Sequence, residues 1–502
     1  MKFLYSLSMN LRRGFLSTIF RLTGAALLLA SFSTSLPVHG AEKWAGPTFQ
    51  EFSGVNQGSP DSPSVSGGSV GWERHDIYWS QLEPTPGNWR DDSLQRWGET
   101  VLAFKAHGVQ VLPVLDFNTS WSFDRGARTW EFGKDRWQLM PRPDGKYDEV
   151  HYTEQQDNTW KQADSRVTGV DDKWPLAAEH VKDWENYVRR VVTFLRRPPY
   201  NVEYFQIWNE AHPNSGFWDG DMDDYINRVQ LPAARVIHEL GGKVVYGGWP
   251  CCGALRDLTA LLDKNKAWSS IDVIDVHYEP VSAWDYLHKA AVTRGFSNFG
   301  YWQTELGFTK DFGFISNTYP RMLAWSLATG WTHSGEHKVF YFADWSPEDP
   351  AAFGYDCTLR SGSSLSPHGQ SLTALSQLLG AGVLHLQKGL TTTPALQTDI
   401  DEKRPSIESF RVGQSIVIAV HWDKSDPAQS LAVQLPFPLT KINSVERVDV
   451  AGGRSDVTAQ ATASSAKQTA AAVSVLDDPT SEASTWFANS SIRTFYVVIT
   501  LK

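Results

Sequence analysis

Apolar runs of strand length alternate with amphipathic stretches of helical length between about residues 50 and 380. The runs Val109–Phe117 and Ile271–Tyr278 are largely apolar, which is typical of strands buried on both faces. Strands are predicted at residues 52–56, 70–79, 109–117, 202–210, 243–249, 271–278, 299–306 and 338–345. Helices are predicted at residues 93–107, 176–197, 222–240, 255–266, 283–293, 320–330 and 370–379. Strands alternating with helices imply parallel pairing, and eight such units predict a (β/α)8 TIM barrel.

Two segments depart from this alternation. Residues 118–173 are rich in Trp, Asp and Arg and show neither the strand nor the helix period, so we expect a long irregular insertion of the lid or binding-loop kind. After Gly380, short β-rich runs separated by turn residues predict an antiparallel β-sandwich, at residues 415–422, 431–435, 445–450 and 494–501. Residues 457–472 are rich in Ala, Ser and Thr and are expected to form an exposed loop.

The first 40 residues have the pattern of a signal peptide. Arg12, Arg13 and Arg21 precede the apolar stretch 22–32, which is too short to span a bilayer, and small residues favour cleavage after Gly40. The Arg-Arg pair resembles a twin-arginine export signal, although Leu11 stands where Ser or Thr is usual. We therefore expect a periplasmic or secreted protein without a membrane anchor after signal removal. The predicted parts are the signal peptide (1–40), the barrel with its insertion (41–380) and a β-sandwich accessory domain (381–502).

Composition narrows the classes of partner. The net charge is −10 and no long basic run is present, which argues against nucleic acid. The 22 Trp residues are open to two interpretations, core packing or stacking against sugar rings. The alternatives stay open for five Trp residues in the insertion or directly after it, Trp121, Trp130, Trp137, Trp160 and Trp174. The three cysteines, Cys251, Cys252 and Cys357, are either buried thiols or include one disulfide.

The carboxyl ends of barrel strands form the active face, so the polar residues at predicted strand ends are candidates for chemistry. Glu210 ends the fourth strand and Glu305 the seventh, which places two carboxylates on nearly opposite sides of the barrel mouth. Paired carboxylates are what glycosidic bond cleavage needs, because one protonates the departing oxygen and the other attacks carbon or activates water. No C-x-x-C or H-E-x-x-H pattern is present, so we expect neither a metal nor an organic cofactor.

Trp208-Asn209-Glu210 on the fourth strand and Thr304-Glu305 on the seventh resemble the two signatures of clan A glycoside hydrolases. Within the clan, the phrase from Arg74 to Trp89 (RHDIYWSQLEPTPGNW) is most similar to glycoside hydrolase family 39, and the resemblance covers the barrel. The resemblance implies that Glu210 is the general acid/base and Glu305 the nucleophile. It also implies substrate-binding or supporting roles for Asn209, Arg74, His277, Tyr278 and Trp345.

The sequence departs from the family pattern in two places. Ala211 replaces the Pro that usually follows the fourth-strand motif. Glu279 stands where a Tyr is expected to hydrogen-bond the nucleophile, so either Tyr278 takes that role or Glu279 adds a third carboxylate. The resemblance also predicts a cis peptide bond between Trp345 and Ser346.

The sequence thus predicts an exported retaining β-glycoside hydrolase that cleaves oligo- or polysaccharides by double displacement. Endo and exo action both remain open. The rival function is a carbohydrate-binding protein on an inactive barrel. The β-sandwich is interpreted as a structural cap, with a sugar-binding module as the alternative.

Overall fold

The structure is a computed structural model that describes residues 46–171, 173–331, 336–345, 357–423, 430–464, 470–476, 490 and 492–502. The predicted signal peptide lies outside these residues. Within them, no helix is both long enough and apolar enough to cross a membrane.

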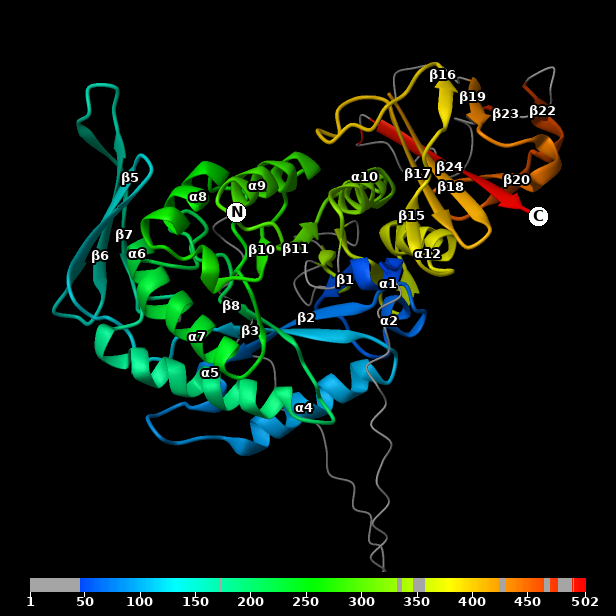
Figure 1. Cartoon of the computed structure of the whole chain (residues 1–502). Helices are drawn as coiled ribbons and strands as arrows, with labels where there is room; N and C mark the ends of the chain where they lie inside the picture. The colour runs from blue at the N-terminus through cyan, green and yellow to red at the C-terminus, as the bar shows by residue number, and fades with distance from the viewer. Residues whose placement is uncertain are drawn as a thin grey trace, which may run out of the picture. The chain divides into compact units, whose positions relative to one another are not determined.

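Eight parallel strands close into a barrel in the order β1-β12-β11-β10-β9-β8-β3-β2, and helices surround it (Figure 1). The predicted TIM barrel is therefore confirmed. The strands are β1 (Ser53–Asn56), β2 (Trp72–Tyr78), β3 (Gln110–Asp116), β8 (Tyr204–Ile207), β9 (Lys243–Val245), β10 (Val273–Asp275), β11 (Gly300–Gly307) and β12 (His337–Phe342).

The interior of the barrel is filled by one large or branched apolar side chain from each of seven strands. These residues pack as one buried cluster: Trp72, Leu112, Tyr204, Val245, Val273, Trp302 and Phe340. The eighth strand, β1, contributes Gly54, and a Cβ there would overlap the Phe340 ring. A glycine is needed at position 54 because the Phe340 ring occupies the space that a side chain at this position would need.

Most predicted helices are present, with shifted ends. The main helices are α4 (Asp91–Lys105), α5 (Val181–Arg196), α7 (Leu231–Glu239), α8 (Leu255–Lys264), α9 (Val281–Thr293), α10 (Phe314–Thr329) and α12 (Pro367–Leu379). Shorter ones are α1 (Phe49–Phe52), α2 (Pro63–Ser66), α3 (Trp79–Leu82) and α6 (Met222–Asp224).

Two helix predictions need correction, and both involve proline. The helix predicted to begin at Pro320 begins at Phe314, and Pro320 lies inside it. The helix predicted over 222–240 contains a π-helical segment, Tyr225–Gln230, between α6 and α7. Pro232 follows this segment and lacks the N–H that a regular helix would use, which favours a local change of hydrogen-bond spacing.

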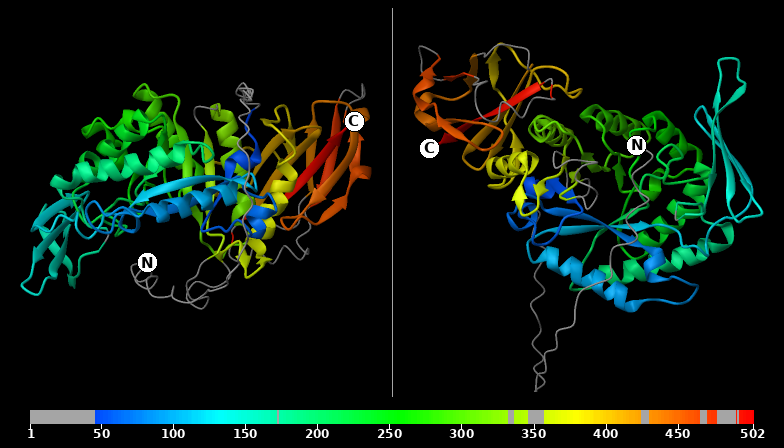
Figure 2. Two further views of the ribbon diagram at one scale, coloured as in Figure 1. Left: turned by 90° about the horizontal axis from the view of Figure 1, so that it is seen from below. Right: turned by 180° about the vertical axis from the view of Figure 1, so that it is seen from behind.

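The insertion is not irregular, contrary to the prediction. It contains a four-stranded antiparallel sheet at the side of the barrel (Figures 1 and 2), made of β4 (Arg128–Phe132), β5 (Asp135–Pro141), β6 (Tyr147–Glu154) and β7 (Trp160–Thr168). Strand β7 is exposed or half-buried along its whole length, so it shows no alternation of apolar and polar residues. One face of the sheet has its own core, which contains Phe123, Trp130, Trp137, Leu139, Tyr147 and Trp174. Trp130 and Trp137 of the insertion, and Trp174 directly after it, thus serve packing.

The C-terminal part is a β-sandwich, as predicted. A six-stranded sheet has the order β15-β17-β18-β24-β20-β21, and a four-stranded sheet has the order β16-β19-β23-β22. Their strands are β15 (Leu384–Leu386), β16 (Thr391–Thr393), β17 (Ser406–Val412), β18 (Ser415–Asp423), β19 (Ser430–Leu435), β20 (Ile442–Val448), β21 (Arg454–Asp456), β22 (Ala461–Ala463), β23 (Ala471–Leu476) and β24 (Ile492–Leu501). A two-stranded sheet, β13 (Arg360–Ser361) and β14 (Ser364–Leu365), precedes α12.

The loop predicted at 457–472 is wrong in part, because it contains β22 and the start of β23. Alanine disfavours strands intrinsically, but β23 pairs with β19 along its length and buries Ala471, Val473 and Val475 in the sandwich core. Tertiary burial overrides the local preference here.

The sandwich is joined to the barrel through a buried arginine on α10. Arg321 donates from Nη2 to Ser406 Oγ at 2.9 Å and from Nη1 to Asn317 Oδ1 at 2.8 Å. Its Nη2 also donates to the carbonyl of Arg404 at 3.1 Å. These bonds connect a barrel helix to strand β17 and the segment before it.

All three cysteines lie in the described part of the chain. Cys357 is buried, as one prediction had it, whereas Cys251 and Cys252 are exposed. No disulfide is formed among them in this structure.

Candidate active site

A layer of polar side chains lies directly above the apolar cluster of the barrel. In four strands the apolar residue is followed two positions later by a polar one, and side chains two apart point to the same face. The pairs are Trp72 and Arg74, Tyr204 and Gln206, Val273 and Asp275, and Trp302 and Thr304. The inward face therefore changes from apolar to polar within one step toward the carboxyl ends of the strands.

Hydrogen bonds connect this layer across the barrel. Arg74 Nε donates to Gln206 Oε1 at 2.8 Å, and Gln206 Nε2 donates to Asp275 Oδ2 at 3.1 Å. The same Asp275 oxygen accepts from Thr304 Oγ1 at 2.6 Å, and Asn56 Nδ2 donates to the Thr304 carbonyl at 2.7 Å. Sequence reasoning missed Asn56, Gln206 and Asp275 as site residues. The signal that could have found them is the two-residue step from an inward apolar residue.

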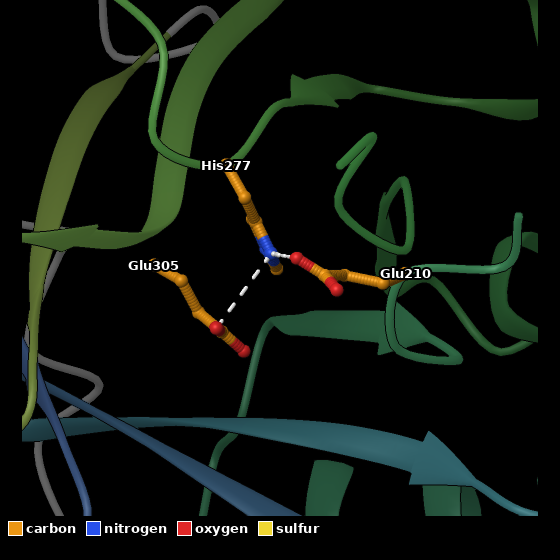
Figure 3. Close-up of side chains that lie close together, drawn as sticks. All are labelled: Glu210, His277 and Glu305. Atoms are coloured by element: carbon orange, nitrogen blue, oxygen red, sulfur yellow. Dashed lines mark hydrogen bonds and ion pairs between the residues drawn. The ribbon is translucent and has the colours of Figure 1, made fainter. Parts of the chain in front are cut away.

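Glu210 and Glu305 face one another above this layer. Glu210 follows β8 by three residues and Glu305 lies on β11, and Figure 3 shows both side chains directed toward His277. One oxygen of each carboxylate and one nitrogen of His277 all lie within 4.8 Å of one another. The Glu305 side chain is 9% exposed and that of Glu210 13%. The two strand ends thus place a pair of largely buried carboxylates within reach of one substrate atom.

The backbone that carries Glu210 is in an unusual conformation. Trp208 and Glu210 both have positive φ, 67° and 43°, which costs energy for residues with side chains. The turn is held by the Glu210 N–H, which donates to the Gly247 carbonyl at 2.6 Å, and by Ser215 Oγ, which donates to the Glu210 carbonyl at 2.6 Å. With Ala211 in place of Pro, these bonds and not a fixed ring define the turn after the motif.

Arg74 links Glu305 to Asn209. Its Nη1 donates to Glu305 Oε1 at 2.8 Å and its Nη2 to Asn209 Oδ1 at 2.6 Å. The arginine is buried, and although burial lowers its pKa, the Glu305 charge and neighbouring aspartates raise it above its ordinary value. A fixed positive charge therefore lies against one oxygen of Glu305 and orients the Asn209 amide.

Tyr278, and not Glu279, contacts Glu305. Its hydroxyl donates to Glu305 Oε2 at 2.9 Å, and its N–H donates to the Glu305 carbonyl at 3.0 Å. Tyr278 has a positive φ of 56°, which turns the chain after β10 and shifts the register by one residue relative to the expected pattern. The Glu279 N–H instead donates to Gln303 Oε1 at 2.9 Å.

His277 lies between the carboxylates. Its Nδ1 is 2.9 Å from Glu210 Oε1 and 3.9 Å from Glu305 Oε2, while Nε2 is 3.0 Å from Thr304 Oγ1 (Figure 3). Burial alone would lower the pKa of His277, but the Glu305 charge, the hydrogen bonds to Asp275 and Glu210, and the Asp275 charge outweigh burial and raise it to about 10. The ring fits only because Gly248 has no side chain, since a Cβ there would overlap it.

The pKa of Glu305 is raised by burial. The charges of His277 and Arg74 and the Tyr278 hydrogen bond each act to lower it, whereas Glu210 adds to the rise. As expected, the Arg74 charge favours the ionised form of Glu305. It is one of three contributions that lower the pKa of Glu305, and together they oppose the rise caused by burial.

Glu210, His277 and Glu305 are also a group that could hold a metal ion by distance. Metal binding at this group would require His277 to lose its proton, because only a neutral imidazole nitrogen can bind a metal ion.

Trp345 lies three residues beyond β12 and is 43% exposed, with the Arg360 guanidinium 5.7 Å from its ring centre. Its role under the substrate stays a prediction. The predicted cis bond to Ser346 involves a residue outside the described part of the chain, and a cis bond is present at Phe342–Ala343.

No protein-family model matches the sequence, and no curated protein matches it. The structure is similar to that of a GH30 endoxylanase from Clostridium papyrosolvens C71, with a TM-score of 0.52 and 10% identity over 91% of this chain and 97% of that one. It is also similar to a family 39 glycoside hydrolase from Bacteroides cellulosilyticus WH2, with a TM-score of 0.50 and 14% identity over 89% and 81% of the two chains. The resemblance expected from the sequence is confirmed at the level of the fold, which this chain shares with these two glycoside hydrolases.

Proposed function

We propose that the protein is a retaining β-glycoside hydrolase acting on oligo- or polysaccharides. The observation that carries this proposal is the facing pair of carboxylates, Glu210 and Glu305, at the carboxyl ends of two barrel strands. One oxygen from each lies within 4.8 Å of the other. Retaining enzymes have carboxyl groups about 5–5.5 Å apart, whereas inverting ones need about 6.5–9.5 Å to admit a water molecule. The short separation favours retention.

In the first step, an oxygen of ionised Glu305 attacks the anomeric carbon, and the bond from that carbon to the leaving oxygen breaks. Glu210 gives its proton to that oxygen, so the leaving group departs as an alcohol. Arg74 and Tyr278 each bind a different oxygen of Glu305, which fixes the plane of the carboxylate and favours its ionised form.

In the second step, Glu210 takes a proton from water, and the hydroxide oxygen attacks the same carbon. The glycosyl ester bond to Glu305 breaks and the carboxylate is restored. His277 hydrogen-bonds Glu210 and lies 3.9 Å from Glu305, so its positive charge favours ionised Glu305 in the free enzyme, where Glu210 holds the proton, and ionised Glu210 once Glu305 is esterified. Asn209, held by Arg74, is the candidate for binding the sugar hydroxyl beside the anomeric carbon.

The test is turnover by the mature protein on aryl β-glycosides and on plant and bacterial polysaccharides. Because one structural neighbour is an endoxylanase, xylan and xylo-oligosaccharides are the first substrates to try. Single sugars released from aryl glycosides would indicate exo action, and oligosaccharides released from a polymer would indicate endo action. Nuclear magnetic resonance of the first product should show a β-anomer, and an α-anomer would contradict retention.

Variants assign the two roles. Glu305→Gln and Glu210→Gln should each lose most of the rate, and Glu210→Gln should keep more activity on substrates whose leaving groups need no proton. Glu99→Gln, on the exposed face of α4, is the matched control. Near-normal activity in Glu305→Gln would remove the nucleophile assignment. Sugar binding without turnover by the unmodified protein would favour the rival function, a carbohydrate-binding protein.

We also propose that the chain is exported and cleaved after Gly40. The support is the Arg-rich start followed by an apolar stretch too short to span a bilayer. A mass spectrum of the exported protein should begin at Ala41. A chain that begins inside the barrel would contradict the cleavage site.

A further inference from the structure

Two adjacent cysteines lie in the turn that follows β9 at the active end of the barrel. Cys251 and Cys252 are the central residues of a tight turn closed by the Gly253 N–H, which donates to the Pro250 carbonyl at 2.9 Å. Both thiols are exposed. We infer that the exported enzyme closes this pair into a vicinal disulfide, which makes the turn a rigid surface for the leaving group of the substrate.

The segment that leads into this turn is bound directly to the site residues. The Gly247 carbonyl accepts the Glu210 N–H, and Gly248 packs against His277. Trp249 donates its N–H to the Asp275 carbonyl at 2.9 Å and accepts the His277 N–H at 2.9 Å. A change in the conformation of the turn therefore reaches Glu210 and His277 through no more than four residues of chain.

The hydrogen bond from the Glu210 N–H to the Gly247 carbonyl places the turn on the Glu210 side of the site. Partial burial raises the pKa of both thiols, that of Cys252 to about 12, and the Glu210 carboxylate raises both further. Glu279 also acts on Cys251. Resting on the proposed function, the leaving group departs on this side, because Glu210 is the residue that protonates its oxygen.

The ring closes by an ordinary thiol–disulfide exchange. A disulfide-containing oxidant forms a mixed disulfide with one cysteine, and the second cysteine displaces it. One S–S bond forms in the protein, two thiol protons are lost, and the two electrons reduce the oxidant to two thiols. The extracytoplasmic compartment predicted for this chain supplies such oxidants. The raised pKa values leave little thiolate near neutral pH, so the closure should be slow without a catalyst.

A bond between neighbouring residues has a shorter Cα separation than an ordinary disulfide and is strained, which makes it reducible. The disulfide between Cys251 and Cys252 closes a small ring, which stops the rotation of both side chains. The two sulfur atoms then form an apolar, polarisable surface. Such a surface suits contact with the apolar face of a sugar ring, as a preformed site that loses little entropy on binding.

The first experiment tests the bond without reference to activity. Protein purified from the exported fraction is treated with an alkylating reagent under denaturing conditions, and the peptide containing residues 251 and 252 is weighed. We expect a peptide without alkyl groups and about 2 Da lighter than the reduced form, and alkylation at both positions after dithiothreitol. Alkylation of both cysteines without reduction, even after incubation with oxidised glutathione at pH 8.5, would overturn the inference. Cys357→Ser should leave the result unchanged, because Cys357 is buried elsewhere.

The second experiment tests the role in binding. A glycosyl fluoride has a leaving group of one atom, whereas an oligosaccharide places a sugar on the Glu210 side. The double variant Cys251→Ser/Cys252→Ser should raise KM for the oligosaccharide at least threefold, change KM for the fluoride less, and match the dithiothreitol-treated enzyme. Equal KM values in all three forms would refute the binding role. Inactivity of the unmodified protein on every substrate would count against the proposed function and leave the mass result standing.

Discussion

Replacing Tyr278 by phenylalanine removes one hydroxyl from the surroundings of Glu305. That hydroxyl donates to Glu305 Oε2 at 2.9 Å, while Arg74 binds the other oxygen, so the variant keeps one of the two bonds that orient the carboxylate. A hydrogen bond to a charged group contributes about 1.5–3 kcal/mol net. The bond favours the ionised form of Glu305, so its loss raises the pKa of Glu305 further above its ordinary value.

The size of the effect should depend on pH. In the acidic limb of the pH profile of kcat/KM, Glu305 is mostly protonated. Loss of the hydrogen-bond energy there lowers the ionised fraction of Glu305, and with it kcat/KM, by about 10- to 150-fold. On the alkaline side Glu305 is ionised in both enzymes, and the defect should be much smaller. The acidic limb of the kcat/KM profile therefore moves to higher pH in Tyr278→Phe.

The assay is initial rates across the pH range on the best aryl glycoside, with stability checked by thermal unfolding. Tyr301→Phe is the matched control, because its hydroxyl is buried and has no hydrogen-bond partner among the described residues. An acidic limb at the same pH in Tyr278→Phe and the unmodified enzyme would refute the reasoning. A loss of equal size at every pH would show that the hydroxyl orients Glu305 without affecting its ionisation.

Three further predictions concern the surroundings of the site and the junction with the sandwich. Gly248→Ala should lower the free energy of unfolding by at least about 1–2 kcal/mol, because φ is +71° and the new Cβ overlaps His277. Urea unfolding measures this loss, and kcat should fall as well. Arg321→Met should lower the free energy of unfolding by about 1.5–3 kcal/mol through lost bonds to Ser406, and kcat/KM at 25 °C should stay unchanged. The folded-state pKa of His277 is raised from 6.5 to about 10, so its contribution to stability is complete below pH 6.5 and is lost as pH rises toward 10. The free energy of unfolding should fall by up to about 1.4 kcal/mol per pH unit in that window, and a His277→Gln variant that keeps the same slope would contradict this assignment.

The barrel could be predicted from the sequence because its strands are buried on both faces. A strand covered by helices outside and side chains inside reads as a continuous apolar run, and such runs separated by helical periods leave few alternatives. The motifs around Glu210 and Glu305 could be placed for the same reason, since each follows or ends a recognisable strand.

The insertion sheet could not be predicted because its strands are not buried on two faces. Strand β7 has polar residues on both faces, so its backbone hydrogen bonds to β6, and not apolar burial, hold it in the sheet. Likewise, half of β23 consists of Ala and Ser, and its partner β19 decides its conformation. The deciding interactions come from the preceding strand for β7 and from residues distant in the sequence for β23.

The sequence by itself determined on which strands the candidate residues Glu210 and Glu305 lie, because strand order and the direction of parallel strands follow from local periodicity. Only the tertiary structure decided that Tyr278 and not Glu279 holds Glu305, since a single left-handed residue after β10 shifts the register by one. It also decided that His277 lies charged between the two carboxylates, which a barrel achieves by closing strands far apart in the chain around a shared interior. Distances and pKa shifts depend on that closure, because burial and charge act through space and not along the chain.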